Sequence, residues 1–208
     1  MWHTSSSATW GASSVPTDIA KGRRMTQFQA LAGYVGQLQQ KNNWCWNATT
    51  VSVAHHYNKM TDWTQCSLAT AVLNDEYSGW FTQNPGQPKF DCCGPNGGPW
   101  NCNTGWWPDE GPLQKVGHKA DGPRLGVLSK QEITQEVTGN RPILVNIAWA
   151  GGGGHIVNIF GYHHLADGTV TDVWVHDPWD GMYIIPYEEL RDKYKTNGTW
   201  TASMKSRP

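Results

Sequence analysis

The sequence lacks the features of membrane-spanning and nucleic-acid-binding proteins. No apolar run reaches the roughly 20 residues that a membrane-spanning helix requires. Lysine and arginine together make up only 16 of the 208 residues, form no long cluster and leave a formal net charge of −1. A nucleic-acid-binding domain would instead carry a basic patch or stripe. We therefore expect neither a membrane span nor a nucleic-acid partner.

A conventional export signal is also missing. The first residues contain neither the basic segment nor the apolar segment of a secretory signal peptide. Residues 1–24 are instead rich in Ser, Thr and Ala, which predicts a flexible leader with little core. If the protein is exported, either the chain is a mature fragment or a dedicated secretion machine delivers it.

Cysteine is scarce, and its count is odd. Of the five cysteines, Cys45 stands apart, and the others lie in a loop-rich region at Cys66, Cys92, Cys93 and Cys102. No Cys-x-x-Cys pair occurs, and adjacent cysteines rarely both reach one metal ion, so we expect no metal and no cofactor. A bond between Cys92 and Cys93 would be strained, which favours pairing Cys66 with one of them and Cys102 with the other. Two disulfides and one free thiol predict an oxidising destination; reduced thiols in a cytosol are the alternative.

Residues 25–118 are expected to form a helical, loop-rich lobe. Residues spaced three and four apart between Trp46 and Tyr57 predict a helix, and residues 67–74 predict a second, shorter one. Residues 76–118 are rich in Gly, Pro, Asn and Trp and hold three cysteines. They predict a loop held by disulfides.

Residues 119–208 are expected to form a second lobe built on strands. Ser129 and Glu132 make a capping box, which predicts the start of a helix that ends near Gly139. Strand-like runs follow at 143–149, 155–162, 170–176 and 182–185, with a short helix over 187–194. Helices followed by antiparallel strands predict an α+β fold with two lobes in one domain.

Cys45 lies between two tryptophans at the start of the first predicted helix. A thiolate is the reactive form of cysteine, and the free amides and dipole of a helix N-terminus stabilise it. A lone cysteine is more often an inert buried thiol. The other residues considered below favour a nucleophile.

His155 is the strongest candidate for the base among eight histidines. It follows four glycines, which let a substrate backbone approach, and it opens an apolar strand. Asp177 ends another strand, where its carboxylate can orient the imidazole. Asp172 and Asp180 are competing assignments. Asn158, three residues after His155, is expected to face the opposite way and to be structural.

A tetrahedral intermediate requires donors for its oxyanion. The backbone amide of Cys45 is one candidate, and the side-chain amide of Gln39 is the other. Gln40 is an open alternative to Gln39.

The segment from Gln39 to Trp46, with the downstream histidine and aspartate, resembles the papain-like cysteine peptidases. Gln-Gln-Lys-Asn-Asn-Trp-Cys is especially similar to the staphopains and to bacterial effector peptidases delivered into plant cells. The likeness extends over about residues 30–200. It implies a papain-like two-lobed fold with four roles: Cys45 as nucleophile, His155 as base, Asp177 as orienting residue and Gln39 as oxyanion donor. One departure is that plant and lysosomal relatives use asparagine as the third residue.

The expected function is a cysteine endopeptidase, as a secreted bacterial effector or interbacterial toxin. Its partners would be a protein or peptide substrate and a cognate inhibitor or immunity protein, and we expect a monomer. The same scaffold can also hydrolyse cell-wall amides, deamidate glutamine or transfer acyl groups. A non-catalytic binding module is a third hypothesis, because tryptophans lie in predicted loops, among them Trp100, Trp106, Trp107 and Trp149.

Overall fold

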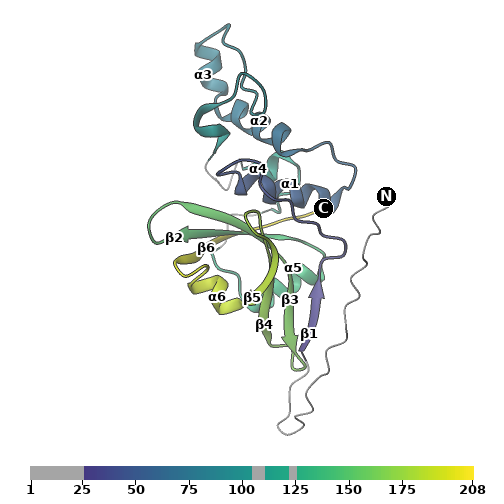
Figure 1. The fold of residues 1–208 in the computed structure, drawn as a ribbon. Helices are drawn as coiled ribbons and strands as arrows, with labels where there is room; N and C mark the ends of the chain where they lie inside the picture. The colour runs from purple at the N-terminus through teal and green to yellow at the C-terminus, as the bar shows by residue number, and fades with distance from the viewer. Residues whose placement is uncertain (1–25, 105–110, 122–125) are drawn as a thin grey trace, which may run out of the picture.

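The computed structural model describes residues 26–104, 111–121 and 126–208, so the predicted leader, Trp106 and Trp107 lie outside the described residues. A helical lobe stands above a sheet lobe (Figure 1). The helical lobe contains α1 (Cys45–Tyr57), α2 (Gln65–Glu76), α3 (Ser78–Gln83), the 3-10 helix η1 (Pro99–Cys102) and α4 (Pro112–Lys115). The sheet lobe contains β1 (Thr26–Ala30), α5 (Lys130–Thr138), β2 (Ile143–Trp149), β3 (Gly154–Leu165), β4 (Val170–Asp177), β5 (Gly181–Pro186), α6 (Tyr187–Asp192) and β6 (Gly198–Lys205). None of the described helices is both long and apolar enough to cross a membrane.

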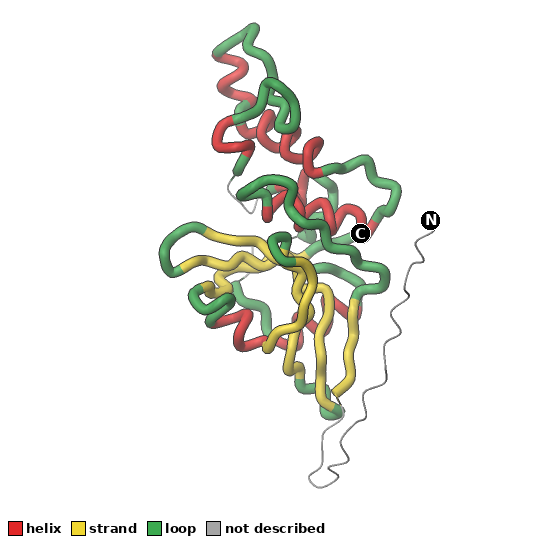
Figure 2. Tube along the Cα trace, in the orientation of Figure 1, coloured by secondary structure: helices red, strands yellow, loops and turns green. Residues whose placement is uncertain are grey.

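The strands form one antiparallel sheet in the order β5-β4-β3-β2-β6, and β1 pairs with the C-terminal half of β3. Alternate side chains of β3 point to opposite faces of the sheet and pack into different hydrophobic cores. Val157 and Ile159 join a cluster with Ile133 of α5 and Leu190 of α6, whereas Ile156 packs with the helical lobe. The sheet is therefore covered by α5 and α6 on one face and by α1 on the other (Figure 2).

The expected α+β fold is confirmed, and so are the predicted helices and strands, within three residues at their ends. The capping box of α5 is present, with the Ser129 hydroxyl accepting from the amide of Glu132. β1, β6 and the short helices α3, η1 and α4 were not predicted, and these three helices lie within residues 76–118, which were expected to be loop. β1 is short and polar, and its Phe28 is exposed. Because β1 belongs to the sheet, the sheet lobe takes a strand from the half of the chain that was expected to be helical.

Helix α1 is buried almost all round, with eleven of its thirteen residues in the interior. Its spacing predicted a single apolar face, but the helix lies between α2 and the sheet. The helix can bury three hydroxyl groups because each donates to a backbone carbonyl one turn earlier. Thr49 donates to Cys45 O at 2.7 Å, Thr50 to Trp46 O at 2.7 Å and Ser52 to Ala48 O at 2.7 Å.

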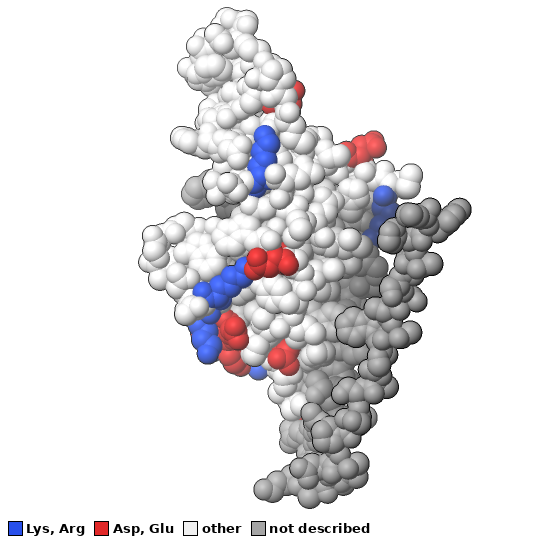
Figure 3. Space-filling model, viewed as in Figure 1, with Lys and Arg blue, Asp and Glu red and all other residues white. Residues whose placement is uncertain are grey.

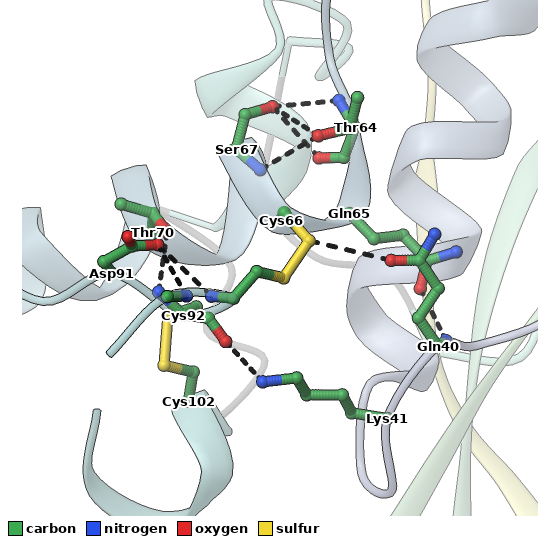
Figure 4. The surroundings of a disulfide bond; sticks show 12 residues. Gln40, Lys41, Thr64, Gln65, Cys66, Ser67, Thr70, Asp91, Cys92 and Cys102 are labelled. Atoms are coloured by element: carbon green, nitrogen blue, oxygen red, sulfur yellow. Dashed lines mark hydrogen bonds between the residues drawn. A yellow bond between two sulfur atoms is a disulfide. The ribbon is translucent and has the colours of Figure 1, made fainter. Parts of the chain in front are cut away.

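Two disulfides hold the loops of the helical lobe. Cys66 pairs with Cys93 and Cys92 pairs with Cys102, so the adjacent cysteines bond to different partners. Figure 4 shows Lys41 reaching the carbonyl of Cys92 from the segment that precedes α1. The disulfide-bonded loop thus contacts and supports the segment just before Cys45.

Residues 31–40 cross the face of the sheet under close restraint. The Tyr34 ring stacks on Phe160 at 5.1 Å, and the Tyr34 hydroxyl donates to Nδ1 of His176 at 3.0 Å. Nε2 of His176 then donates to the carbonyl of Gln37 at 3.0 Å. Gly36 lies against the imidazole, where an added Cβ would come within 2.2 Å of the ring. We call Tyr34, Gly36, Gln37 and His176 the crossing clamp.

Replacing Gly36 by alanine should therefore loosen the clamp. The new methyl group has no room beside the buried His176 ring, so the free energy of unfolding should fall by about 1–3 kcal/mol. Gly79→Ala is the matched control, because a Cβ at that position in α3 meets nothing within 4 Å. Urea unfolding followed by tryptophan fluorescence measures both variants. Equal free energies of unfolding for the two variants would contradict the predicted clash between a Cβ at position 36 and the His176 ring.

His176 should resist protonation. Burial lowers its pKa to about 4, although its hydrogen bond with Gln37 acts in the opposite direction. The unfolded chain takes up this proton near pH 6.5 and the folded chain only near 4. The free energy of unfolding should thus decrease by about 3 kcal/mol, from this group, as pH falls between those values. A ¹⁵N-histidine NMR titration with parallel urea melts tests this, and a His176 midpoint near 6.5 would contradict it.

Candidate active site

The structure brings the predicted site residues to the junction of the two lobes. Cys45 begins α1, His155 is the second residue of β3 and Asp177 is the last residue of β4. Because β3 and β4 are antiparallel, the start of one strand lies beside the end of the other. The register therefore places His155 and Asp177 together.

The imidazole of His155 is fixed by its hydrogen bond to Asp177. Nε2 donates to Oδ1 of the carboxylate at 2.8 Å, and both side chains are 0% exposed. The indole of Trp179 stacks on the ring at 3.9 Å and 20°. Nδ1 is buried and has no described nitrogen or oxygen atom as a hydrogen-bond partner, whereas the Cys45 thiol interacts with the ring. With Nε2 occupied, Nδ1 is the nitrogen left for a reacting partner.

Cys45 interacts with this imidazole. It is the free cysteine of the described chain and is 9% exposed. Burial tends to lower the pKa of His155, but the hydrogen bond to Asp177 and the interaction with the Cys45 thiol outweigh it, so the pKa is raised above 6.5. The site thus favours the protonated imidazole beside the sulfur.

The carboxylate of Asp177 is surrounded by donors. Burial tends to raise its pKa, but the hydrogen bond from His155 and the charge of that ring, with further donors, hold the pKa far below its usual range. Trp179 N donates to Oδ1 at 2.8 Å. Oδ2 accepts from Tyr194 at 2.6 Å and lies 2.7 Å from the Lys195 ammonium.

Sequence reasoning missed Trp179, Tyr183, Tyr194 and Lys195 around Asp177. Trp179 could have been suspected, since it follows the aspartate by two residues. The other three lie on β5 and after α6, and no spacing in the sequence linked them to the site.

The competing carboxylates lie elsewhere. Asp172 is 4.0 Å from Nδ1 of His163. Asp180 is exposed and pairs with Lys195. Neither has a hydrogen bond or ion pair with His155 among the described contacts.

Gln39 and Gln40 have different surroundings. Gln39 N donates to the carbonyl of Pro178 at 2.9 Å, directly beside Asp177, and its Nε2 donates to Lys41 O at 2.9 Å. This second bond orients the amide and leaves one N–H of Nε2 unused. Gln40 packs instead against Gln65 and the sulfur of Cys66 (Figure 4).

A cleft of about 590 Å³ is lined by Gln39, Gln40, Asn101, Pro178 and Trp179. A larger cavity of about 940 Å³ lies among α2, η1 and α4, and none of the predicted catalytic residues lines it. The cleft beside Trp179 is thus the space next to the candidate site.

Asn158 is structural, as its position on β3 predicted. It is fully buried, and its Nδ2 donates to Tyr34 Oη at 2.7 Å and to Thr49 O at 3.0 Å. It thereby ties β3 to α1 and to the crossing clamp.

Among the described residues, no group of three or more His, Cys, Asp or Glu side chains is arranged to hold a metal ion. On the face shown in Figure 3, the blue and red side chains lie close to one another and form no broad basic surface.

The family model described as "Peptidase_C39 like family" matches residues 32–206. A solved structure titled "Crystal Structure of Pseudomonas Avirulence Protein AvrPphB" is similar over 86% of this chain and 100% of that chain, with 12% identity and a TM-score of 0.39. The curated proteins gave no match. Because the family match covers most of the 208 residues, it confirms the expectation of a cysteine peptidase, and the chain belongs to the peptidase C39-like family.

Proposed function

We propose that this cysteine peptidase cleaves proteins with Cys45 as nucleophile, His155 as general base and acid, Asp177 as orienting residue and Gln39 as an oxyanion donor. The observation that carries the proposal is the buried imidazole, which is hydrogen-bonded to Asp177 through Nε2 and has Nδ1 left for the sulfur. A binding module would have no need for this arrangement.

The reaction begins with the Cys45 thiolate, whose proton is held on Nδ1 of His155. The sulfur attacks the scissile carbonyl carbon and forms a C–S bond, and the carbonyl oxygen becomes an oxyanion. When the C–N bond breaks, the imidazolium gives its proton to the leaving amine. His155 then takes a proton from water, the resulting hydroxide attacks the thioester, and the thiolate is released with the carboxylic acid product.

Asp177 and Trp179 fix the ring for both proton transfers. The carboxylate selects the tautomer with hydrogen on Nε2. The stacked indole covers one face of the imidazole, which keeps water from that face and holds the plane of the ring. The proton therefore travels between the sulfur and the leaving nitrogen through Nδ1 alone.

Both Gln39 and Gln40 line the cleft with Trp179. Gln39 is favoured as oxyanion donor because its backbone is bonded to Pro178, next to Asp177, whereas the side chain of Gln40 contacts the sulfur of Cys66. The Lys41 carbonyl holds the amide in place. A donor that is fixed before substrate binds stabilises the developing charge without reorganisation.

We further propose that residues 25–208 act as the catalytic domain after a leader, and that the protein functions outside the cell that makes it, as an effector or toxin. Its two disulfides support an oxidising destination. An exported peptidase of this kind would require a cognate inhibitor in the producing cell.

Cys45→Ala should abolish proteolysis and leave the fold intact, because only one buried sulfur atom is removed. New N-termini in a lysate incubated with wild type, but not with the variant, would establish cleavage and identify targets. Equal cleavage by both proteins would overturn the assignment of Cys45. If wild type produces no new termini while iodoacetamide still labels Cys45 rapidly, the chemistry is amide hydrolysis, deamidation or acyl transfer on another substrate.

Gln39→Ala should reduce kcat about 10²–10³-fold, as expected for loss of one oxyanion donor. Gln40→Ala is the matched control and should lose less than about tenfold, since the Gln40 side chain contacts the sulfur of Cys66. Steady-state kinetics on a substrate found in the N-terminus experiment compares the two. A larger loss of kcat in Gln40→Ala would assign the role of oxyanion donor to Gln40 instead.

A further inference from the structure

The two oxygens of Asp177 have different partners. Oδ1 accepts from His155 Nε2 and from the amide of Trp179. Oδ2 faces away from the imidazole and accepts from Tyr194, while the ammonium of Lys195 lies 2.7 Å from it. A lysine thus forms an ion pair with the same carboxylate that orients the candidate base.

We propose that Lys195 is a positioning residue of the candidate active site, and that its ammonium offsets the charge of Asp177 and so limits how strongly the carboxylate favours the imidazolium form of His155. This inference rests on the proposed function, in which His155 is the base.

The backbone around Lys195 is arranged to direct it to the site. Lys195 and the next residue, Thr196, both have left-handed backbone conformations, with φ of 45° and 82°. Such values are uncommon for residues with a side chain and are strained for a β-branched one. The turn is closed by Thr196 N donating to Lys193 O at 2.8 Å. Strain of this kind persists only where surrounding contacts enforce it, and it is common at functional sites.

Lys195 also supports the ring that covers His155. Its ammonium lies 5.3 Å from the centre of the Trp179 ring and 5.6 Å from that of Tyr194, within the range of a cation–π contact. Since Trp179 stacks on His155, the lysine contacts both the carboxylate and the indole that fix the imidazole.

The charges around His155 determine what removing this ammonium would do. Cys45, Asp177 and His176 interact with the imidazole directly. Behind Asp177 lie Tyr183, Tyr194, Lys195 and Asp180. His176 is neutral because burial lowers its pKa to about 4. The tyrosines are neutral because burial raises their pKa values. Lys195 and Asp180 are thus the charges behind Asp177.

Of these two charges, that of Lys195 acts more strongly on Asp177. Lys195 lies against the buried oxygen, with 31% of its side chain exposed, whereas Asp180 is 56% exposed and better screened by solvent. Without the ammonium, the full charge of a buried carboxylate would act on His155. The imidazolium would then hold its proton more tightly, and a base that is too strong is a poor acid for the leaving amine.

The test is the titration of the Cys45–His155 pair, followed by the pH dependence of Cys45 alkylation and by NMR of ¹⁵N-labelled histidine. Lys195→Met should raise the midpoint of the upper titration step, in which the His155 imidazolium loses its proton, by roughly half to one pH unit. Lys195→Arg keeps the charge and should restore the wild-type profile. Lys193→Met removes an exposed lysine two residues away and should leave the midpoint unchanged.

Asp177→Asn provides the opposite change. It removes the carboxylate and leaves the ammonium, so the midpoint should fall below that of wild type. The double variant Asp177→Asn with Lys195→Met removes both charges and should return the midpoint toward wild type. Lys195→Gln replaces the methionine variant if the latter does not fold, as judged by near-ultraviolet circular dichroism.

A midpoint in Lys195→Met and Lys195→Gln equal to that of Lys193→Met would overturn the inference, as would a double variant no different from Asp177→Asn. Both measurements proceed without substrate. Absence of proteolysis by wild type would therefore count against the proposed function alone, whereas an unmoved titration in an active peptidase would count against the role of Lys195 alone.

Discussion

A buried carboxylate is stable only where enough donors surround it, and Asp177 lies where several parts of the fold supply them. His155 comes from β3, Tyr183 from β5, and Tyr194 and Lys195 from the turn before β6. Each of these elements must hold its register for the carboxylate to keep its charge. The antiparallel sheet is therefore the framework of the candidate site as well as the core of its lobe.

The candidate nucleophile, Cys45, depends on the other lobe and on how the two lobes are joined. α1 is buried nearly all round, so Cys45 is held at a helix start that has little freedom to move. The segment before it is tied to the disulfide-bonded loop, since Trp44 Nε1 donates to the carbonyl of Asn101 at 2.9 Å and Lys41 reaches Cys92. The crossing clamp then fixes residues 31–40 on the sheet. In this way, contacts in both lobes hold a cysteine of one lobe beside a histidine of the other.

Much of this arrangement could be predicted from local patterns. The helix after Cys45, the capping box at Ser129 and the runs that became β2 to β5 depend on spacing and on neighbouring residues, which the sequence displays directly. β1 escaped prediction because it is five residues of mostly polar sequence with an exposed phenylalanine. Its place in the sheet comes from pairing with β3, which no local pattern reveals.

The candidate chemistry divides in the same way. Cys45, His155 and Asp177 could be selected by sequence alone, because each stands at a predicted element end and because the order of residue types is that of a thiol peptidase. The different surroundings of Gln39 and Gln40, the stacking of Trp179 and the ion pair of Lys195 come from tertiary structure. The physical reason is that these features depend on contacts between strand ends and turns far apart in the chain, where the direction of a single side chain is set by packing and backbone strain. Sequence determined which reactive groups this protein has, and the folded structure determined which neighbours control their charge.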